Sequence, residues 1–174
     1  MIIFRDVFTE DELFSDSYKY KIVDDLYYEV EGKLTTRSND FDDALIGANA
    51  SAEDGAETFD RQQESGIDIV LNHSLMKHDA YDKKAYMQYL KKYMKRLAEH
   101  VKNEKGEDAA KVMKDKLNES VPKKILPNLK NYDFYSGGEN FGDQEGMLAL
   151  LDWREDGVTP FFIFFKDGLV QEKF

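Results

Sequence analysis

The chain of 174 residues contains no cysteine. This absence excludes disulfide bonds, thiol catalysis and zinc sites built on thiolates. The longest uninterrupted apolar run covers residues 161–165, far short of the ~18–20 residues that cross a bilayer. The N-terminus shows no basic leader followed by an apolar stretch, so we expect no secretory signal. The sequence therefore indicates a protein without a membrane span, and we expect it in the cytoplasm.

Motifs of catalysis are also missing. Gly137 and Gly138 are not followed by the Lys and Ser or Thr of a phosphate-binding loop, and the chain has no nucleophile elbow. The histidines, His73, His78 and His100, lack the i, i+4 spacing of a helical metal site, and we interpret them as surface or partly packed residues. The sequence predicts a protein that is not an enzyme and requires no cofactor.

Acidic residues are abundant, with 35 Asp and Glu against 24 Lys and Arg. The cluster Glu10, Asp11 and Glu12 and the acidic segment 39–68 offer oxygen ligands without a defined spacing, which predicts weak calcium binding at best. The stretch from Asp152 is similar to an EF-hand loop at its start, but Ile163 stands where a bidentate Glu is needed. The position of any metal site is unknown from sequence.

The charge is unevenly distributed. Residues 82–124 hold 13 Lys and Arg against 7 Asp and Glu, whereas residues 39–68 hold 9 acidic residues and one Arg. With a formal net charge of −11, the whole chain repels nucleic acid. We therefore expect no nucleic-acid partner, unless the basic region acts alone.

Strands are predicted at both ends of the chain. Residues 2–4, 18–23 and 27–31 carry apolar or alternating patterns, and residues 9–15 between them are predicted to be a polar loop or short turn. The β-branched content of residues 67–71 predicts another strand. Residues 131–135, 147–153, 161–166 and 169–173 follow, with a tight turn at 167–168, so the last three are expected to form an antiparallel meander.

A helical hairpin is predicted between these strand regions, over about 82–121. Apolar residues recur at spacings of three and four, and Met87, Met94 and Ala98 are expected to widen this apolar stripe. A break around Gly106 separates the two helices, which should pack antiparallel, and Pro122 and Pro127 are expected to end the second. Strands on either side of one helical hairpin indicate the α+β class, in a single domain covering 1–174.

Residues 38–66 are predicted to form a long flexible loop. Polar and small residues dominate this stretch, and after Ile46 only Phe59 is bulky and apolar before Ile67. Such a composition cannot offset the entropy of ordering.

Four lysines fall on one line of the first predicted helix. Lys84, Lys91, Lys95 and Lys102 are separated by seven, four and seven residues, which places them opposite the apolar stripe. The pattern alone favours a solvated helix face. The positive excess of this region beside a negative remainder favours an electrostatic docking surface instead, and the acidic loop would partly neutralise it if it folded back.

Several long strings resemble the translationally controlled tumour protein (TCTP) family, also known as fortilin or histamine-releasing factor. They are the segment 46–53, with Ile46, Gly47, Asn49, Ser51 and Glu53, together with residues 1–6, 29–33, 68–73, 131–135, 146–160 and 164–168. These ordered matches extend over nearly the whole chain. The resemblance implies a β-tent, which is a set of small sheets with a projecting helical hairpin and a long flexible loop. The related zinc-binding chaperones of Rab-type GTPases use Cys ligands that have no counterpart here, so zinc is not implied.

The resemblance also implies a multi-partner cytosolic protein that supports cell growth and survival. Implied partners are calcium, tubulin or microtubules, a Ras-like small GTPase and Bcl-2-type proteins, and some members act outside the cell, which implies non-classical secretion. The GTPase-facing glutamate of the family falls on Glu12, and the tubulin-binding segment falls on residues 82–124.

Three residues depart from the family pattern. Ala44 stands where some members carry a phosphorylatable Ser, which removes that control. The chain ends in Phe174 instead of Cys, so dimerisation through that thiol is excluded and a monomer is expected. Asp25 occupies the position of a small Gly in the segment 14–32, where a BH3-like resemblance is claimed in relatives, and this weakens the expected Bcl-2-type contact.

Two classes of function remain open from the sequence. One is an interaction protein that binds calcium and microtubules, and the other is a regulator that promotes nucleotide exchange on a Ras-like GTPase through Glu12. On sequence pattern alone, Glu12 is also expected to be a solvated loop carboxylate.

Overall fold

The most apolar stretch of the chain forms the middle of the largest sheet in the computed structural model, which describes residues 1–38, 63–138 and 146–174. Strand β10 (Pro160–Phe165) is buried at every position and pairs antiparallel with β4 (Tyr27–Glu31) and β9 (Ala149–Trp153). A strand buried on both faces needs no polar alternation, which explains its run of Phe and Ile. The sheet order is β3–β4–β10–β9–β8–β7, with β3 (Tyr20–Val23) and β7 (Met76–His78) at the edges and β8 (Asp133–Ser136) between β9 and β7.

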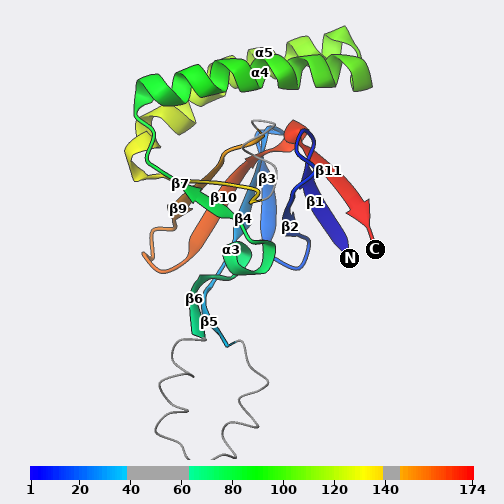
Figure 1. Cartoon of the computed structure of the whole chain (residues 1–174). Helices are drawn as coiled ribbons and strands as arrows, with labels where there is room; N and C mark the ends of the chain where they lie inside the picture. The colour runs from blue at the N-terminus through cyan, green and yellow to red at the C-terminus, as the bar shows by residue number, and fades with distance from the viewer. Residues whose placement is uncertain (39–62, 139–145) are drawn as a thin grey trace, which may run out of the picture.

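A second sheet brings the two ends of the chain together. Strand β1 (Ile2–Asp6) lies between β2 (Glu12–Ser15) and β11 (Leu169–Lys173), and both pairs are antiparallel. The termini therefore lie side by side (Figure 1), where the amide of Phe174 donates to the carbonyl of Met1 at 2.8 Å. Every strand pair in the described part of the chain is antiparallel, so the predicted α+β class is confirmed.

The predicted helical hairpin is present as α4 (Lys83–Lys105) and α5 (Glu107–Ser120), which together are called the arm below. Asp82 caps α4, because its carboxylate accepts a hydrogen bond from the amide of Ala85 at 2.7 Å. Gly106 links the helices with φ of +99°, a conformation that glycine adopts without steric cost. The arm lies across the ends of the strands (Figure 1).

Aromatic side chains attach the arm to the sheets. Tyr93 packs edge-to-face on Phe8, and the Arg96 guanidinium lies 4.2 Å from the centre of the Phe8 ring. The Tyr89 hydroxyl donates to the carbonyl of Gly146 and accepts from the amide of Leu148, both at 2.8 Å. The buried residues of α4 are those of the predicted stripe: Tyr86, Leu90, Tyr93, Leu97 and Val101.

Of the residues expected to widen the apolar stripe, Met94 and Ala98 pack against the core and Met87 does not. Met87 is 40% exposed, while Met94 and Ala98 are only partly buried against the core. The reason is the position of α5, which covers one flank of α4 and leaves these three side chains at the seam between the helices.

The segment after α5 is also helical, but its helix type changes. Helix α5 ends at Ser120, just before Pro122, and a π-helical turn (Val121–Ile125) and a 3-10 helix (Leu126–Asn131) carry the chain to β8. Proline removes one backbone donor, and these wider and tighter turns accommodate its ring.

The structure corrects four local predictions, beginning with the loop or short turn predicted at residues 9–15. Residues 12–15 form β2, whose Leu13 and Phe14 are buried, and Phe14 stacks on Phe164 of the larger sheet. Only the turn before Glu12 is a loop, closed by Asp6, whose carboxylate accepts hydrogen bonds from the amides of Phe8 and Met147. Two buried residues and pairing with β1 outweigh the polar composition of this stretch.

The predicted strand at 67–71 is a short helix, α3 (Asp68–His73), preceded by β6 (Gln63–Ile67). The Asp68 carboxylate accepts hydrogen bonds from the amides of Ile69 and Lys33 at 2.8 Å, which turns the chain at this point. Ile69 is fully buried. Tertiary packing of one isoleucine therefore overrides the β-branched propensity.

The last three strands do not form a meander. Strands β9 and β10 pair as predicted, but residues 166–168 form a 3-10 turn that sends β11 to β1 in the other sheet. The predicted bounds of the flexible loop, 38–66, are also corrected at both ends, because β5 (Leu34–Ser38) pairs with β6 and residues 38 and 63–66 lie in these strands. The remaining residues of that loop, including Ala44 and the family-like positions Ile46, Gly47, Asn49, Ser51 and Glu53, lie outside the described residues.

Candidate functional site

Glu12 lies at the start of β2, on the wall of a cleft with a volume of about 330 Å³. The structure corrects its interpretation as a solvated loop carboxylate, since Glu12 Oε1 lies 2.7 Å from Nδ1 of His73. The side chain is 38% exposed, so one oxygen is held while the other faces the cleft. The cleft, called the Glu12 cleft below, is lined by Arg5, Glu10, Asp11, Glu12, Asn72, His73, Ser74 and Gly138.

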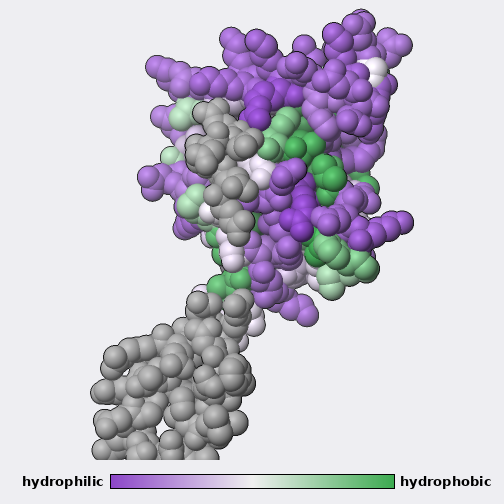
Figure 2. All heavy atoms as spheres, turned by 45° about the vertical axis from the view of Figure 1, so that its right-hand side comes forward, coloured by the Kyte–Doolittle hydropathy of each residue, from purple (hydrophilic) through white to green (hydrophobic). Residues whose placement is uncertain are grey.

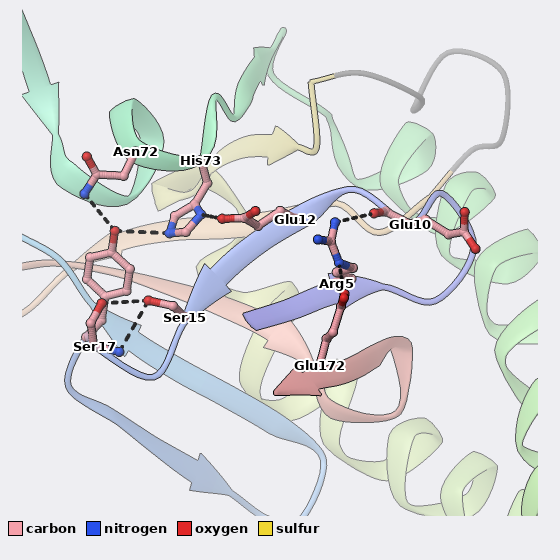
Figure 3. Close-up of polar contacts among 9 residues, drawn as sticks. Arg5, Glu10, Glu12, Ser15, Ser17, Asn72, His73 and Glu172 are labelled. Atoms are coloured by element: carbon pink, nitrogen blue, oxygen red, sulfur yellow. Dashed lines mark hydrogen bonds and ion pairs between the residues drawn. The ribbon is translucent and has the colours of Figure 1, made fainter. Parts of the chain in front are cut away.

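A chain of hydrogen bonds fixes His73 behind Glu12 (Figure 3). Nε2 of His73 lies 3.2 Å from the Tyr18 hydroxyl, which accepts a hydrogen bond from the Asn72 amide at 2.9 Å. The pattern fits a neutral imidazole that donates from Nδ1 to Glu12 and accepts at Nε2 from Tyr18. Burial lowers the pKa of His73 and outweighs the opposing effect of Glu12, which favours this neutral state.

The other acidic residues of the cleft do not converge on Glu12. Figure 3 shows the Glu10 side chain pointing away, while its backbone carbonyl accepts a hydrogen bond from Arg5 at 3.3 Å. Arg5 also donates to Glu172 at 2.5 Å. Asp11 is buried, and its side chain lies against the backbone of Gly137. Within residues 1–38, 63–138 and 146–174, no group of three or more His, Asp or Glu residues is arranged to hold a metal ion.

The predicted lysine line lies on the arm. Since an α-helix turns roughly 100° per residue, Lys84, Lys91 and Lys95 project from the side of α4 opposite Tyr93, as predicted. Lys102 lies 3.3 Å from Glu107 across the helical link, in an ion pair between exposed side chains. The lysine line and the Glu12 cleft are therefore separate surfaces, one on the helices and one on the sheets.

Sequence reasoning missed Tyr18, Asn72 and His73 as neighbours of Glu12. His73 was interpreted as a surface or partly packed residue, but its side chain is only 6% exposed. The contact joins residues 61 positions apart, and no spacing rule connects a strand to a helix at that separation. The resemblance of residues 68–73 to a family string was the one signal that this segment matters.

The segment 14–32, expected to carry a BH3-like contact, is folded into β2, β3 and β4. Asp25 lies in the turn between β3 and β4, where its carboxylate accepts a hydrogen bond from Lys166 at 2.5 Å. Tyr27 and Val30 of this segment are fully buried. A helical BH3-like contact would require β4 to leave its place between β3 and β10 in the sheet.

Small antiparallel sheets capped by a helical hairpin define the class of this protein as an α+β fold of the β-tent type. Among solved structures, it is similar to the translationally controlled tumour-associated protein p23fyp of Schizosaccharomyces pombe, with a TM-score of 0.77, 41% identity and full coverage of both chains. It is also similar to the solution structure of the translationally-controlled tumor protein of Caenorhabditis elegans, with a TM-score of 0.71, 34% identity and coverage of 100% and 99%.

Sequence comparison identifies the family directly. The sequence profile of the translationally controlled tumour protein family matches residues 1–170. The chain is 48% identical over 174 residues to the homologue from Lateolabrax japonicus and 47% identical over 176 residues to the protein from Homo sapiens, with 99% of each chain covered in both cases. The chain therefore belongs to the translationally controlled tumour protein family, which is not a known catalytic family. No helix in the described residues is long and apolar enough to cross a membrane.

Proposed function

We propose that this chain is a multi-partner, non-enzymatic binding protein of the cytoplasm that docks on tubulin and microtubules through the lysine line of the arm, and that supports cell growth and survival through such contacts. The observation that carries the proposal is a basic helix face whose lysines are mostly not paired with acidic residues of the described part of the chain. Lys84, Lys91 and Lys95 have no ion pair within the described residues, although the chain as a whole carries a net charge of −11. Acidic surfaces such as tubulin tails complement this face.

Reversal of the lysine line is expected to weaken microtubule binding. We expect Lys84→Glu, Lys91→Glu, Lys95→Glu and Lys102→Glu together to weaken binding about tenfold or more, since exposed ion pairs contribute about 0.2–1 kcal/mol each. The parent should also lose binding as salt rises, because the Debye length falls below ~8–10 Å. The measurement is co-sedimentation with microtubules at low and high salt.

The matched control reverses four exposed lysines outside the arm, Lys19, Lys33, Lys77 and Lys173, which changes the net charge by the same amount. This variant should bind nearly as well as the parent. Equal co-sedimentation of the arm variant and the parent would contradict the proposal, because the helices keep their apolar stripe and should remain folded.

Weak calcium binding is part of the same proposal. Its support is the excess of carboxylates, 35 Asp and Glu in all, together with the affinity of calcium for carboxylate oxygens. Because the described residues gather no metal-binding group, we expect loose binding that orders no fixed site.

A second candidate function is the regulation of a Ras-like GTPase through Glu12. The observation that favours it is the exposed oxygen of Glu12 at the wall of an acidic cleft, held in place by His73. A nucleotide in such a GTPase is held by a phosphate-cradling loop, its Lys and a magnesium ion. A carboxylate presented to that Lys would compete with the phosphates and raise the rate of nucleotide release. A Bcl-2-type partner has the least support, because residues 14–32 are folded into strands.

We expect Glu12→Ala to abolish most of any acceleration of nucleotide release, because it removes the carboxylate from the cleft. The measurement is stopped-flow release of a fluorescent nucleotide from the organism's own Ras-like GTPase. The matched control is Glu10→Ala, which removes an adjacent charge that points away from Glu12. If the parent protein does not accelerate release, the regulator hypothesis fails, and if Glu12→Ala accelerates it as much as the parent, Glu12 is not the contact.

A further inference from the structure

A groove of about 600 Å³ runs along the seam between α4 and α5. Its apolar side chains come from α4 and are Met87, Leu90, Met94 and Ala98. Its basic side chains are Lys84, Lys91 and Lys95 from α4 and Lys114 from α5, and Gln88 and Asn118 complete the lining. We call this the α4 groove. The sequence suggested a line of charge on this side of the helix, and the structure adds an apolar floor beside that charge.

The floor of the α4 groove is partly exposed and includes two flexible methionine side chains. Leu90 is 2% exposed and belongs to the core, whereas Met87 is 40% exposed and Met94 and Ala98 are only partly buried. Methionine side chains are unbranched and polarizable, so they adapt to apolar side chains of varied shape. An apolar surface bordered by polar groups is typical of a partner-binding site.

The charges around the groove favour an acidic partner. Lys84, Lys91, Lys95 and Lys114 form no ion pair within the part of the chain that the structure describes. Towards the helical link, a second depression shares Lys95 and Lys114 and is also lined by Lys102, Lys111, Glu99, Glu107 and Asp115. Acidic side chains therefore enter the lining at that end, whereas the lining of the α4 groove itself holds lysines and no acidic residue. Figure 2 shows that hydrophilic side chains dominate the arm on the face it presents.

We propose that the α4 groove binds an acidic amphipathic helix of a partner protein. Apolar side chains at i, i+3 or i+4 and i+7 of that helix would pack on Met87, Met94 and Ala98, and its carboxylates would lie beside the lysines. From Lys84 to Ala98, α4 rises about 21 Å, which is the length of about four helical turns. The proposal rests on the docking function proposed above and extends it: the lysines alone complement acidic tails, and the apolar floor beside them adds a site for an acidic helix.

An extended acidic tail fits the groove less well than a helix. A tail without apolar anchors engages the lysines alone and leaves the floor in contact with water. Met87, Met94 and Ala98 follow one another at spacings of seven and four, so they form a partly exposed ridge along one side of α4. A second helix with the same periodicity buries this ridge, and apolar burial adds affinity that charge alone does not supply.

The test uses three labelled peptides and fluorescence anisotropy with the full chain. The first is a 15-residue peptide with Leu at helical spacing and Glu elsewhere, the second has the same composition in shuffled order, and the third is oligoglutamate. We expect the first to bind at least about tenfold more tightly than the other two, because only it places its apolar residues on one face. Equal binding of the first two peptides would overturn the proposal.

Substitution in the floor locates the binding. Met87→Gln is expected to weaken binding of the amphipathic peptide about fivefold and to leave binding of oligoglutamate unchanged. The double variant Met87→Gln and Met94→Gln should bind the amphipathic peptide no more tightly than the shuffled peptide. The matched control is Met76→Gln, which replaces an equally exposed methionine on β7, away from the arm. Met87 is exposed, so this single variant should stay folded, and circular dichroism checks this.

The outcomes separate this inference from the proposed function. The lysine variant could lose microtubule binding while Met87→Gln has no effect on binding of the amphipathic peptide. This result would support the docking function and overturn the helix-binding groove. If the amphipathic peptide binds tightly and depends on Met87, but the parent does not bind microtubules, the groove is supported and the docking function is overturned.

Discussion

Phe14→Ala is expected to lower the free energy of unfolding by about 3–5 kcal/mol, the range found for large cavities in protein cores. Phe14 is fully buried and stacks on Phe4 of β1 at 4.3 Å between ring centres and on Phe164 of β10 at 4.6 Å. These contacts join the smaller sheet to the larger one. Loss of the ring removes the packing between two layers, and neither sheet can move in to fill the space without disturbing its own pairing.

Urea denaturation followed by circular dichroism measures this loss. Phe14→Leu keeps most of the volume and should cost less than about 1.5 kcal/mol. Phe174→Ala removes the same side chain from a position that is 72% exposed, and it should change stability by no more than about 0.5 kcal/mol. A loss below about 1 kcal/mol for Phe14→Ala would show that the sheets are held together elsewhere.

The second large effect is expected at Glu29, a buried carboxylate of β4. Its Oε1 accepts a hydrogen bond from Arg154 at 2.8 Å, and its Oε2 accepts one from Lys124 at 3.0 Å. Breaking a buried ion pair costs about 3–5 kcal/mol, and the two cations here keep some access to water, so we expect Glu29→Ala to cost about 2–3 kcal/mol. The contact also ties the helical segment after α5 to the sheet. Glu172→Ala, which removes the partner of Arg5 in an exposed pair, should cost at most about 1 kcal/mol.

The same residue predicts how stability depends on pH. Burial raises the pKa of Glu29, but the hydrogen bonds and charges of Arg154 and Lys124 outweigh burial, so the pKa lies below its usual 4.5. A lowered carboxyl pKa stabilises the folded state above the unfolded value, and this contribution disappears as pH falls through the folded value. We therefore expect the difference in urea midpoint between the parent and Glu29→Gln, measured from pH 7 to pH 3, to be constant above about pH 4.5 and to shrink below it. A difference that stays constant down to pH 3 would contradict this role.

The helical hairpin and most strands were predictable because their signals are local. The apolar positions from Tyr86 to Val101 repeat every three or four residues, Asp82 caps the first helix, and Gly106 separates it from the second. Each of these signals depends on residues that are close to one another in the sequence. The lysine line followed from the same geometry, since residues seven apart share one face of a helix. The family was recognisable from ordered strings alone.

The neighbours of each strand were not predictable in the same way. The turn at residues 166–168 has the sequence of a hairpin turn, yet β11 pairs with β1, more than 160 residues away in the chain. Residues 67–71 have the composition of a strand, yet the hydrogen bonds of Asp68 and the burial of Ile69 make a helix there. Pairing and burial depend on segments distant in sequence, and they outweigh local propensities that differ by only about 1 kcal/mol.

The sequence by itself determined the α+β class, the arm with its line of lysines, and Glu12 as a residue of interest. Only the tertiary structure decided that Glu12 is held by His73, that Glu29 joins Arg154 and Lys124, and that Met87 and Met94 form the floor of a groove. The physical reason is the same in each case. A periodic pattern records which face of an element is apolar, but it does not record which other element covers that face or stops short of it.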